Sequence, residues 1–450
     1  MDFNKQPDVI GNPHIGVIEL NTLWAGYAFF LTVAACLATS IGNTTLTLIV
    51  TLLFAPLVLM PDLLLGPILF FSIFDDFLLV GSNVSASRFL TIFFIAGAMF
   101  LTLHRGRIKQ VSLHFLLLLV LGVFLSFYSI MGYTSFPMSY VLNIILAIAM
   151  INFSRNSPQN IAKHLYSYAV LAIVYVYFLL WRNGFDSLVD GSRMTISEDV
   201  NSNELARGLA ITVTLLVCNL LGFKNNVLVS IFLIGAGLVA LFLTGSRTAL
   251  IAAIVTAFLL YMINAKDKRS KIKAVTLVVI STILLVVIYN AMEKYFPLLM
   301  ERFTVENVEE TGGTGRFDVW KYFFTYIFPQ HWLIGIGFTP TNLYYALVAL
   351  NTEGHGAHNV LVEVLSKTGV VGLVLYTVCF IKFFAATFKK LSKNRFLYWS
   401  IAIVLTMLIS GIGEDILTTR FLWYGIGLGY MLLNAKAQED KALLEDMHNG

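Results

Sequence analysis

The sequence predicts an all-α integral membrane protein: a bundle of about 12–14 transmembrane helices with one long non-cytoplasmic loop that contains an interfacial helix. The composition is the first reason. Hydrophobic residues make up 58% of the 450 residues, charged residues only 12%, and the mean hydropathy is +0.79. Globular proteins carry about 25% charged residues. The composition therefore excludes an ordinary soluble enzyme, a disordered chain and a nucleic-acid-binding protein. The net charge of +4 does not indicate nucleic-acid binding in so apolar a chain.

The second reason is the spacing of the apolar runs, because a span needs about 20 apolar residues. Pro56, Pro61 and Pro67 interrupt the second and third runs, which predicts re-entrant or broken helices there. The runs lie at 22–41, 44–60, 63–80, 88–103, 111–130, 138–152, 165–181, 205–222, 227–243, 248–264, 274–290, 357–378, 396–412 and 417–434.

The third reason is the placement of the basic residues, which predicts the orientation of the chain. Nineteen of the 30 lysines and arginines lie in the tails or on alternate connections, and such connections face the cytoplasm. We therefore expect both termini in the cytoplasm. The predicted domains are a cytoplasmic N-terminal tail at 1–21, a membrane domain at 22–434 and a cytoplasmic C-terminal tail at 435–450.

The connections on the opposite side contain the unusual residues. They lie at 182–204, 244–247, 291–356 and 413–416. The loop 291–356 is far longer than usual connections, and such loops are often functional. Its residues 316–328 place apolar side chains on one helical face, namely Val319, Trp320, Phe323, Phe324 and Ile327. This pattern predicts a helix in the membrane interface or a lid helix packed on the bundle.

Three arginines on that side are candidates for binding an anion. Arg193 is followed by Asn203, just before a span begins. Arg247, beside Ser246, lies at the membrane boundary, where an ionisable side chain indicates function. Arg316 follows a glycine-rich stretch and begins the predicted loop helix, and helix N-termini favour anions. The structural alternative for Arg193 is a solvated side chain, and for Arg247 it is a side chain that snorkels toward the headgroups. For Arg316 the alternative is a flexible glycine-rich loop.

Two histidines precede the run that carries Glu363. His355 and His358 lie three residues apart, and Asn359 follows. A histidine at the membrane face is a natural general base. A capping or interfacial histidine is the structural alternative. No cysteine or compact carboxylate set completes a tetrahedral site, so no metal site is predicted.

The combination indicates one kind of ligand. Arginine forks bind phosphate oxygens in a bidentate manner. Arginines, a base and apolar walls together suit a lipid-linked phosphate or diphosphate, with displacement at the carbon that bears it. Glu414 and Asp415 in the last outer turn would orient an arginine or contact acceptor sugars, or form a simple polar turn.

At these residues the sequence resembles the O-antigen ligase and O-antigen polymerase superfamily. The similar stretches are LFLTGSRTAL at 241–250, GRFDVW at 315–320, LIGIGF at 333–338 and HNVLVEVLSKTGVVG at 358–372. The last stretch is the most specific, and the resemblance is clearest over about 190–375. These stretches, in the right order around one long outer loop, make a strong signal together, although a single short piece alone would be weak.

The resemblance implies a multi-pass glycosyltransferase of the bacterial inner membrane that acts on the periplasmic side. Its donor is a glycan on undecaprenyl diphosphate, and it needs neither a nucleotide sugar nor a divalent metal. Arg247 and Arg316 match the arginines that hold the diphosphate, and Arg193 with Asn203 is a looser match. His358 matches the base, whereas His355 has no assured counterpart. Ser246, Asn359, Glu363 and Glu414 are supporting residues.

Three activities stay open at this point. The implied acceptor is a growing glycan for a polymerase of O-antigen or exopolysaccharide, or lipid A-core for a ligase. Membrane lipids and other polysaccharide-assembly proteins are the further expected partners. A polysaccharide or small-solute transporter or flippase is the rival, because Asp75 and Asp76 form a carboxylate pair inside a phenylalanine-rich run. A scaffolding protein ranks last.

Overall fold

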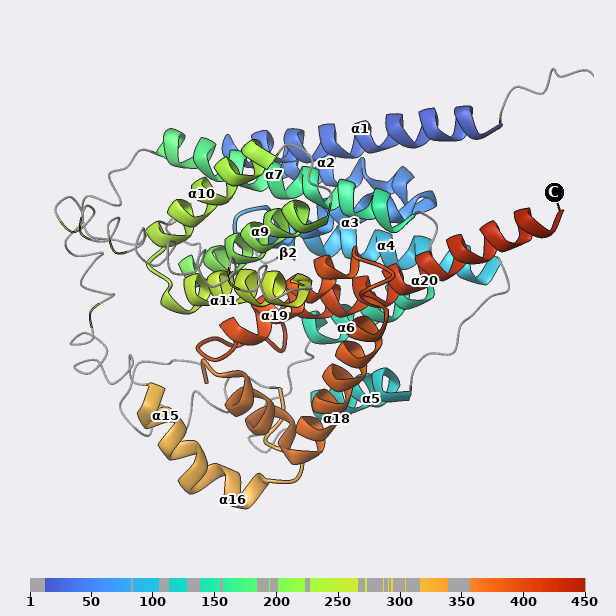
Figure 1. Ribbon diagram of the computed structural model, residues 1–450. Helices are drawn as coiled ribbons and strands as arrows, with labels where there is room; N and C mark the ends of the chain where they lie inside the picture. The colour runs from blue at the N-terminus through green and yellow to red at the C-terminus, as the bar shows by residue number, and fades with distance from the viewer. Residues whose placement is uncertain are drawn as a thin grey trace, which may run out of the picture.

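The computed structural model describes residues 13–81, 84–104, 113–127, 138–153, 157–183, 194, 201–222, 227–265, 316–338 and 357–449, and residues 272, 286, 290, 293 and 304 singly. Helices dominate these residues (Figure 1), which confirms the predicted all-α class. Within them, six helices are long and apolar enough to cross a membrane. They are α1 (Pro13–Ser40), α4 (Ala86–His104), α7 (Pro158–Asn183), α9 (Ser202–Gly222), α11 (Arg247–Asn264) and α18 (Val360–Lys390).

Shorter helices complete the bundle. They are α2 (Thr44–Leu52), η1 (Ala55–Leu59), η2 (Pro61–Leu64), α3 (Leu65–Ile73), α5 (Leu113–Phe127), α6 (Met138–Asn152), α10 (Val227–Leu243) and α19 (Leu397–Ser410), followed by α20 (Arg420–Asn449). The expected broken helices are present, because the chain changes to 3-10 turns at Pro56 and Pro61. Beyond α3, strands β1 (Leu79–Gly81) and β2 (Val84–Ser85) form a small antiparallel ribbon, so the run predicted at 63–80 does not end as a helix.

Two helices extend past the predicted limits of the apolar runs. Helix α1 begins at Pro13 rather than at residue 22, and proline is favoured in a first helical turn. Helix α20 continues through the stretch predicted as a C-terminal tail, because its alanine, lysine, glutamate and leucine residues are strong helix formers. Apart from residues 286 and 290, the run predicted at 274–290 lies outside the described residues.

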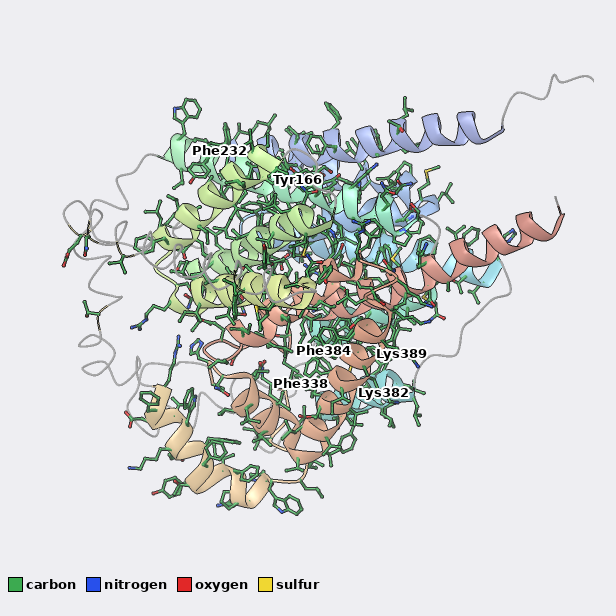
Figure 2. All side chains as sticks on the ribbon, viewed as in Figure 1. Tyr166, Phe232, Phe338, Lys382, Phe384 and Lys389 are labelled. Carbon is green, nitrogen blue, oxygen red and sulfur yellow. The ribbon has the colours of Figure 1, made fainter. Side chains whose placement is uncertain are left out.

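The core forms around α9, which is buried on nearly all sides. Helices α3, α7, α10, α11 and α19 pack against it. Helix α20 packs against both α6 and α19. The outer helices instead expose large apolar side chains, such as Leu228 at 83% and Phe232 at 74% of their surface, and Phe232 lies on the outside of α10 in Figure 2. An apolar outer surface of this kind suits contact with lipid.

The starts of α11 and α18 and the turn 411–419 lie on one side of the bundle, close to the helical segment that begins at Arg316. The start of α1 and the C-terminus lie on the opposite side (Figure 1). The segment from Arg316 comprises α15 (Arg316–Tyr322), η3 (Phe323–Ile327) and α16 (Phe328–His331), and it packs along the outside of α18. We call this side of the molecule the site face.

Candidate active site

A buried carboxylate lies at the centre of the site face. Glu414, 6% exposed, belongs to the turn between α19 and α20. Its Oε1 lies 3.8 Å from Nη2 of Arg316, and its Oε2 lies 3.4 Å from Nδ1 of His358. The Arg316 and His358 side chains keep 23% and 26% of their surface exposed. One carboxylate thus joins a cation and an imidazole that a ligand can still reach.

Arg247 is the first residue of α11, after a turn with almost no loop. Gly245 makes this turn possible, because its φ of +65° is a conformation that favours glycine. Ser246 is buried, and Arg247 is half-buried at the N-terminal end of the helix. The guanidinium and the helix N-terminus both favour an anion at this position.

Gly413 brings the start of α11 and Arg316 to the same turn. A Cβ atom at Gly413 would collide with Cγ2 of Thr248 and would lie 3.3 Å from Nη1 of Arg316. Only glycine fits in this space without a shift of its neighbours. Because Thr248 directly follows Arg247, the structure gathers Arg247, Arg316 and the turn that carries Glu414 at one junction.

The helical segment that carries Arg316 is anchored to α18. Trp320 donates a hydrogen bond from Nε1 to the backbone oxygen of Ala357 (2.7 Å), and Val319 and Phe323 are buried. This packing supports the lid-helix interpretation. The predicted face is not fully buried, because Phe324 is 44% exposed. The π-helical turn at 323–327 explains the difference, since its wider turn shifts the side-chain positions.

His358 has an unusual backbone conformation at the entrance to α18. Its φ is +45°, which is a left-handed backbone conformation that residues other than glycine rarely adopt. Asn359 caps the helix by accepting bonds from the N–H groups of Leu361 and Val362, and its Nδ2 donates to the backbone oxygen of Ile412 (3.0 Å). The cap and this cross-link together fix His358 against the turn 411–419.

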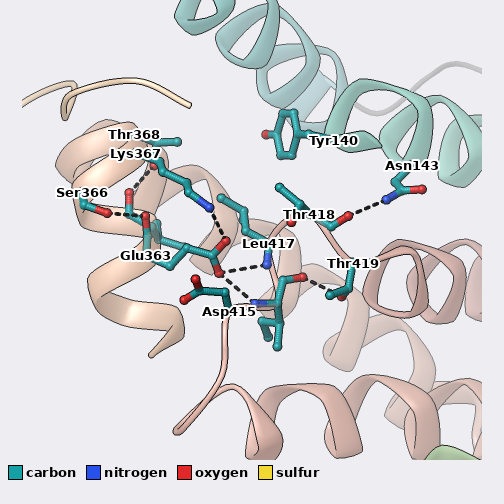
Figure 3. A network of polar contacts seen from close by, with 12 residues as sticks. Tyr140, Asn143, Glu363, Ser366, Lys367, Thr368, Asp415, Leu417, Thr418 and Thr419 are labelled. Carbon is teal, nitrogen blue, oxygen red and sulfur yellow. Dashed lines mark hydrogen bonds and ion pairs between the residues drawn. The ribbon is translucent and has the colours of Figure 1, made fainter. Parts of the chain in front are cut away.

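Glu363 fixes the same turn from inside the protein (Figure 3). It is fully buried, and its Oε2 accepts the backbone N–H groups of Ile416 (2.8 Å) and Leu417 (3.0 Å). Its Oε1 accepts a bond from Nζ of Lys367 at 2.7 Å. Glu363 therefore holds the backbone behind Glu414, which is a structural role.

Two of the sequence motifs meet at a break in α18. Gly369 has φ +64° and ψ −164°, which interrupts the helix. The freed Ser366 oxygen accepts a bond from the N–H of Ile336 (2.7 Å), and the N–H of Val370 donates to Trp332 (2.8 Å). The segment that contains the LIGIGF motif thus replaces the missing helical hydrogen bonds, as buried non-helical backbone requires.

The upstream candidates are only partly visible. Arg193 and His355 lie outside the described residues, whereas the N–H of Met194 donates to Leu243 at the end of α10 (3.0 Å). Asn203 lies in the first turn of α9, where its N–H donates to Oδ1 of Asn201 (2.9 Å).

Arg207 reaches the site face from α9, and the sequence analysis missed it. Its Nη1 donates to the backbone oxygen of Asp415 at 2.6 Å, and its Nη2 pairs with Glu204 at 2.8 Å. The available signal was an arginine close to the start of an apolar run, with a glutamate three residues before it.

The carboxylate pair that favoured a transporter is tied into the bundle. Asp75 pairs with Nη1 of Arg420 at 3.2 Å, and that nitrogen also donates to Ser72 (3.0 Å) and Ser87 (2.6 Å). Asp76 lies beside it in the turn after α3, where burial and the Asp75 charge raise its pKa. Asp75 thus has a structural partner.

The fold and the site define a polytopic α-helical membrane protein with arginines, an imidazole and a buried carboxylate gathered at one end of the bundle. Residues 231–377 match the family model described as O-antigen ligase. This match, which covers about a third of the chain, confirms the predicted resemblance to the O-antigen ligase and polymerase superfamily of glycan-handling membrane enzymes. Comparisons with curated proteins and with solved structures give no significant match.

Proposed function

We propose that this chain is a glycosyltransferase of cell-envelope polysaccharide synthesis, which transfers a glycan from undecaprenyl diphosphate to an acceptor hydroxyl on the periplasmic side. The meeting of Arg316 and His358 on Glu414, next to the start of α11, is the observation that carries the proposal. Arginine forks beside a base, at the end of an apolar bundle, suit a lipid-linked diphosphate.

The reaction is a displacement at the sugar carbon that bears the diphosphate. The acceptor oxygen forms a bond to this carbon, the bond from the carbon to the diphosphate oxygen breaks, and its electron pair leaves with the diphosphate. Arg247 and Arg316 stabilise the departing anion. His358 takes the proton of the acceptor hydroxyl, and Glu414 orients the imidazole through Nδ1. Arg193 and His355 remain secondary candidates for these two roles.

The proposed location is the bacterial inner membrane, with both termini in the cytoplasm and the site face in the periplasm. The basic residues at the end of α18 and in the turn to α19 support this orientation, because they lie at the opposite end of α19 from Glu414. Figure 2 shows Lys382 and Lys389 on this part of α18. The expected partners are the lipid-linked glycan, the acceptor, membrane lipids and other polysaccharide-assembly proteins.

We further propose that the transfer polymerises repeat units of O-antigen or exopolysaccharide. The family match covers residues 231–377, and a preceding part that diverges from the family is what we expect of a polymerase, whose repeat units vary. Attachment of finished polymer to lipid A-core is the second candidate, because the matching family model is described as O-antigen ligase.

A gel of surface polysaccharide from a deletion strain tests these assignments. The strain is complemented with the wild type, Arg247→Ala, Arg316→Ala or His358→Ala, and the amounts of protein are compared. Lys393→Ala, an exposed cation in the turn from α18 to α19, is the matched control and should restore full polymer.

The gel separates the candidate activities. A polymerase leaves a single repeat unit on lipid A-core in the deletion strain, and the three site variants do not restore the ladder. A ligase instead leaves long polymer unattached on its lipid carrier. Wild-type polysaccharide from all three site variants would refute the proposed site and favour a transporter.

A further inference from the structure

Asp415 is a carboxylate at the site face that the reaction described above does not use. It follows Glu414 in the turn 411–419, and its backbone oxygen is held by Arg207. Its side chain is half-buried, and its Oδ1 atom is inaccessible to solvent and accepts no hydrogen bond from any residue that the structure describes. A buried carboxylate oxygen without a donor is costly, so such an atom calls for an explanation.

The charged groups around Asp415 come from three parts of the chain. Glu363 and Lys367 face it from α18, His358 from the segment before α18, and Glu414 from its own turn. Lys367 and His358 favour the charged carboxylate, whereas Glu363 and Glu414 oppose it. Burial, followed by the Glu363 charge, raises the pKa of Asp415 to about 6.

The Lys367 charge is shared between two carboxylates, because its Nζ lies 2.7 Å from Glu363 while it also favours the charged form of Asp415. Glu414 is likewise placed between Arg316 and His358. Among the described groups that act on Asp415, His358 is the one whose charge would change during the proposed reaction. An imidazole that takes a proton becomes a cation, and a nearby carboxylate favours that cation.

We propose that Asp415 is a positioning residue of the site: its carboxylate stabilises the charged imidazole that forms when His358 takes the proton of the acceptor hydroxyl. The inference rests on the proposed function and adds a second carboxylate to it. Glu414 lies beside the imidazole, with Oε2 3.4 Å from Nδ1, whereas Asp415 supplies negative charge that no hydrogen bond from described residues compensates at Oδ1. The proton passes from the acceptor oxygen to His358, and it leaves to solvent after the product departs.

The test measures the proton affinity of His358 without turnover. Diethyl pyrocarbonate modifies neutral imidazole, so the extent of modification of His358 against pH, read by mass spectrometry on the full chain in detergent, gives its titration midpoint. We expect Asp415→Asn to move this midpoint down by about one pH unit, since it removes a neighbouring anion. Asp76→Asn, which neutralises another desolvated carboxyl, should leave the midpoint unchanged.

Stability gives a second and opposite signal. Because the folded-state pKa of Asp415 is raised above its ordinary value, the buried charge opposes folding above about pH 6. Asp415→Asn should therefore melt at the same temperature as the wild type or higher at pH 8, while glycan transfer from the lipid-linked repeat unit of the deletion strain falls about tenfold.

Each outcome decides between distinct claims. An unchanged His358 midpoint in Asp415→Asn, or a lower melting temperature with an unchanged midpoint, overturns the role of Asp415. A wild-type protein that transfers no glycan refutes the proposed function, yet the midpoint still reports whether Asp415 stabilises the charged imidazole. A lower midpoint together with retained stability supports the proposal.

Discussion

Glu414 contacts both proposed working groups while it is almost removed from solvent, so its charge should matter more than its shape. Glu414→Gln keeps the size of the side chain but removes the anion that faces Arg316 and His358. We expect glycan transfer to fall about 10- to 100-fold, in the range that general acid–base partners contribute. The measurement is the rate of polymer formation in membranes that contain equal amounts of protein.

Asp318→Asn is the control for this prediction, because Asp318 is an exposed carboxylate on the same helix as Arg316. It should retain the wild-type rate. Equal rates for Glu414→Gln and the wild type would show that Glu414 only fills space in the turn.

At this scale, the sequence predicted those residues whose chemistry is conspicuous. Arg247, Arg316, His358 and Glu414 were identified because an ionisable side chain at or near the membrane boundary is costly and indicates function. What could not be predicted is which carboxylate contacts which cation, since Glu414 meets His358 only when the turn after α19 packs on the start of α18.

The break in α18 shows what an element-level motif can encode. The stretch 358–372 was the most specific sign of the family, yet the apolar run at 357–378 was predicted as one span, whereas Gly369 interrupts the helix. The reason is that a thirty-one-residue apolar helix looks continuous in its composition. The interruption depends on the LIGIGF segment, which is distant in sequence and supplies the replacement hydrogen bonds.

Gly369→Ala should therefore be strongly destabilising. A Cβ atom there would lie 2.5 Å from the nitrogen of Ile334 and would also collide with the backbone of Leu333, and the φ and ψ angles are ones that glycine alone adopts readily. We expect a loss of about 2 kcal/mol or more of stability, seen as a lower melting temperature in detergent.

Gly26→Ala provides the comparison for this variant. Gly26 lies in α1 with no atom within 4 Å of an added Cβ, so alanine there should be neutral or stabilise by about 0.5 to 1 kcal/mol. If Gly369→Ala and Gly26→Ala have the same melting temperature, the close contact between the LIGIGF segment and α18 is wrong.

For the whole molecule, composition and charge predicted the class because a bilayer imposes the same demand on every span: apolar residues outside and satisfied backbone groups inside. These demands do not specify which helix packs against which. The central place of α9 depends on how the shapes of very similar apolar helix surfaces fit together. The helices that surround it are α3, α7, α10, α11 and α19. Arg207 was missed for the same reason, since its role depends on the central place of α9.

The orientation of the molecule can be tested with two single cysteines, because the natural Cys36, Cys218 and Cys379 are all buried. Ile412, 64% exposed, lies in the turn that carries Glu414, and Ser392 is exposed in the turn between α18 and α19. We expect a membrane-impermeant maleimide to label Ile412→Cys in intact spheroplasts, and Ser392→Cys only after lysis.

The labelling pattern has a direct chemical consequence, because the site can receive a donor only on the side that it faces. Labelling of Ile412→Cys from outside would place Arg316, His358 and Glu414 in the periplasm, where the proposed undecaprenyl-diphosphate donor carries its glycan. The reverse pattern, with Ser392→Cys labelled in intact spheroplasts, would place the site in the cytoplasm. The positive-inside assignment would then be wrong, and so would transfer from a periplasmic donor.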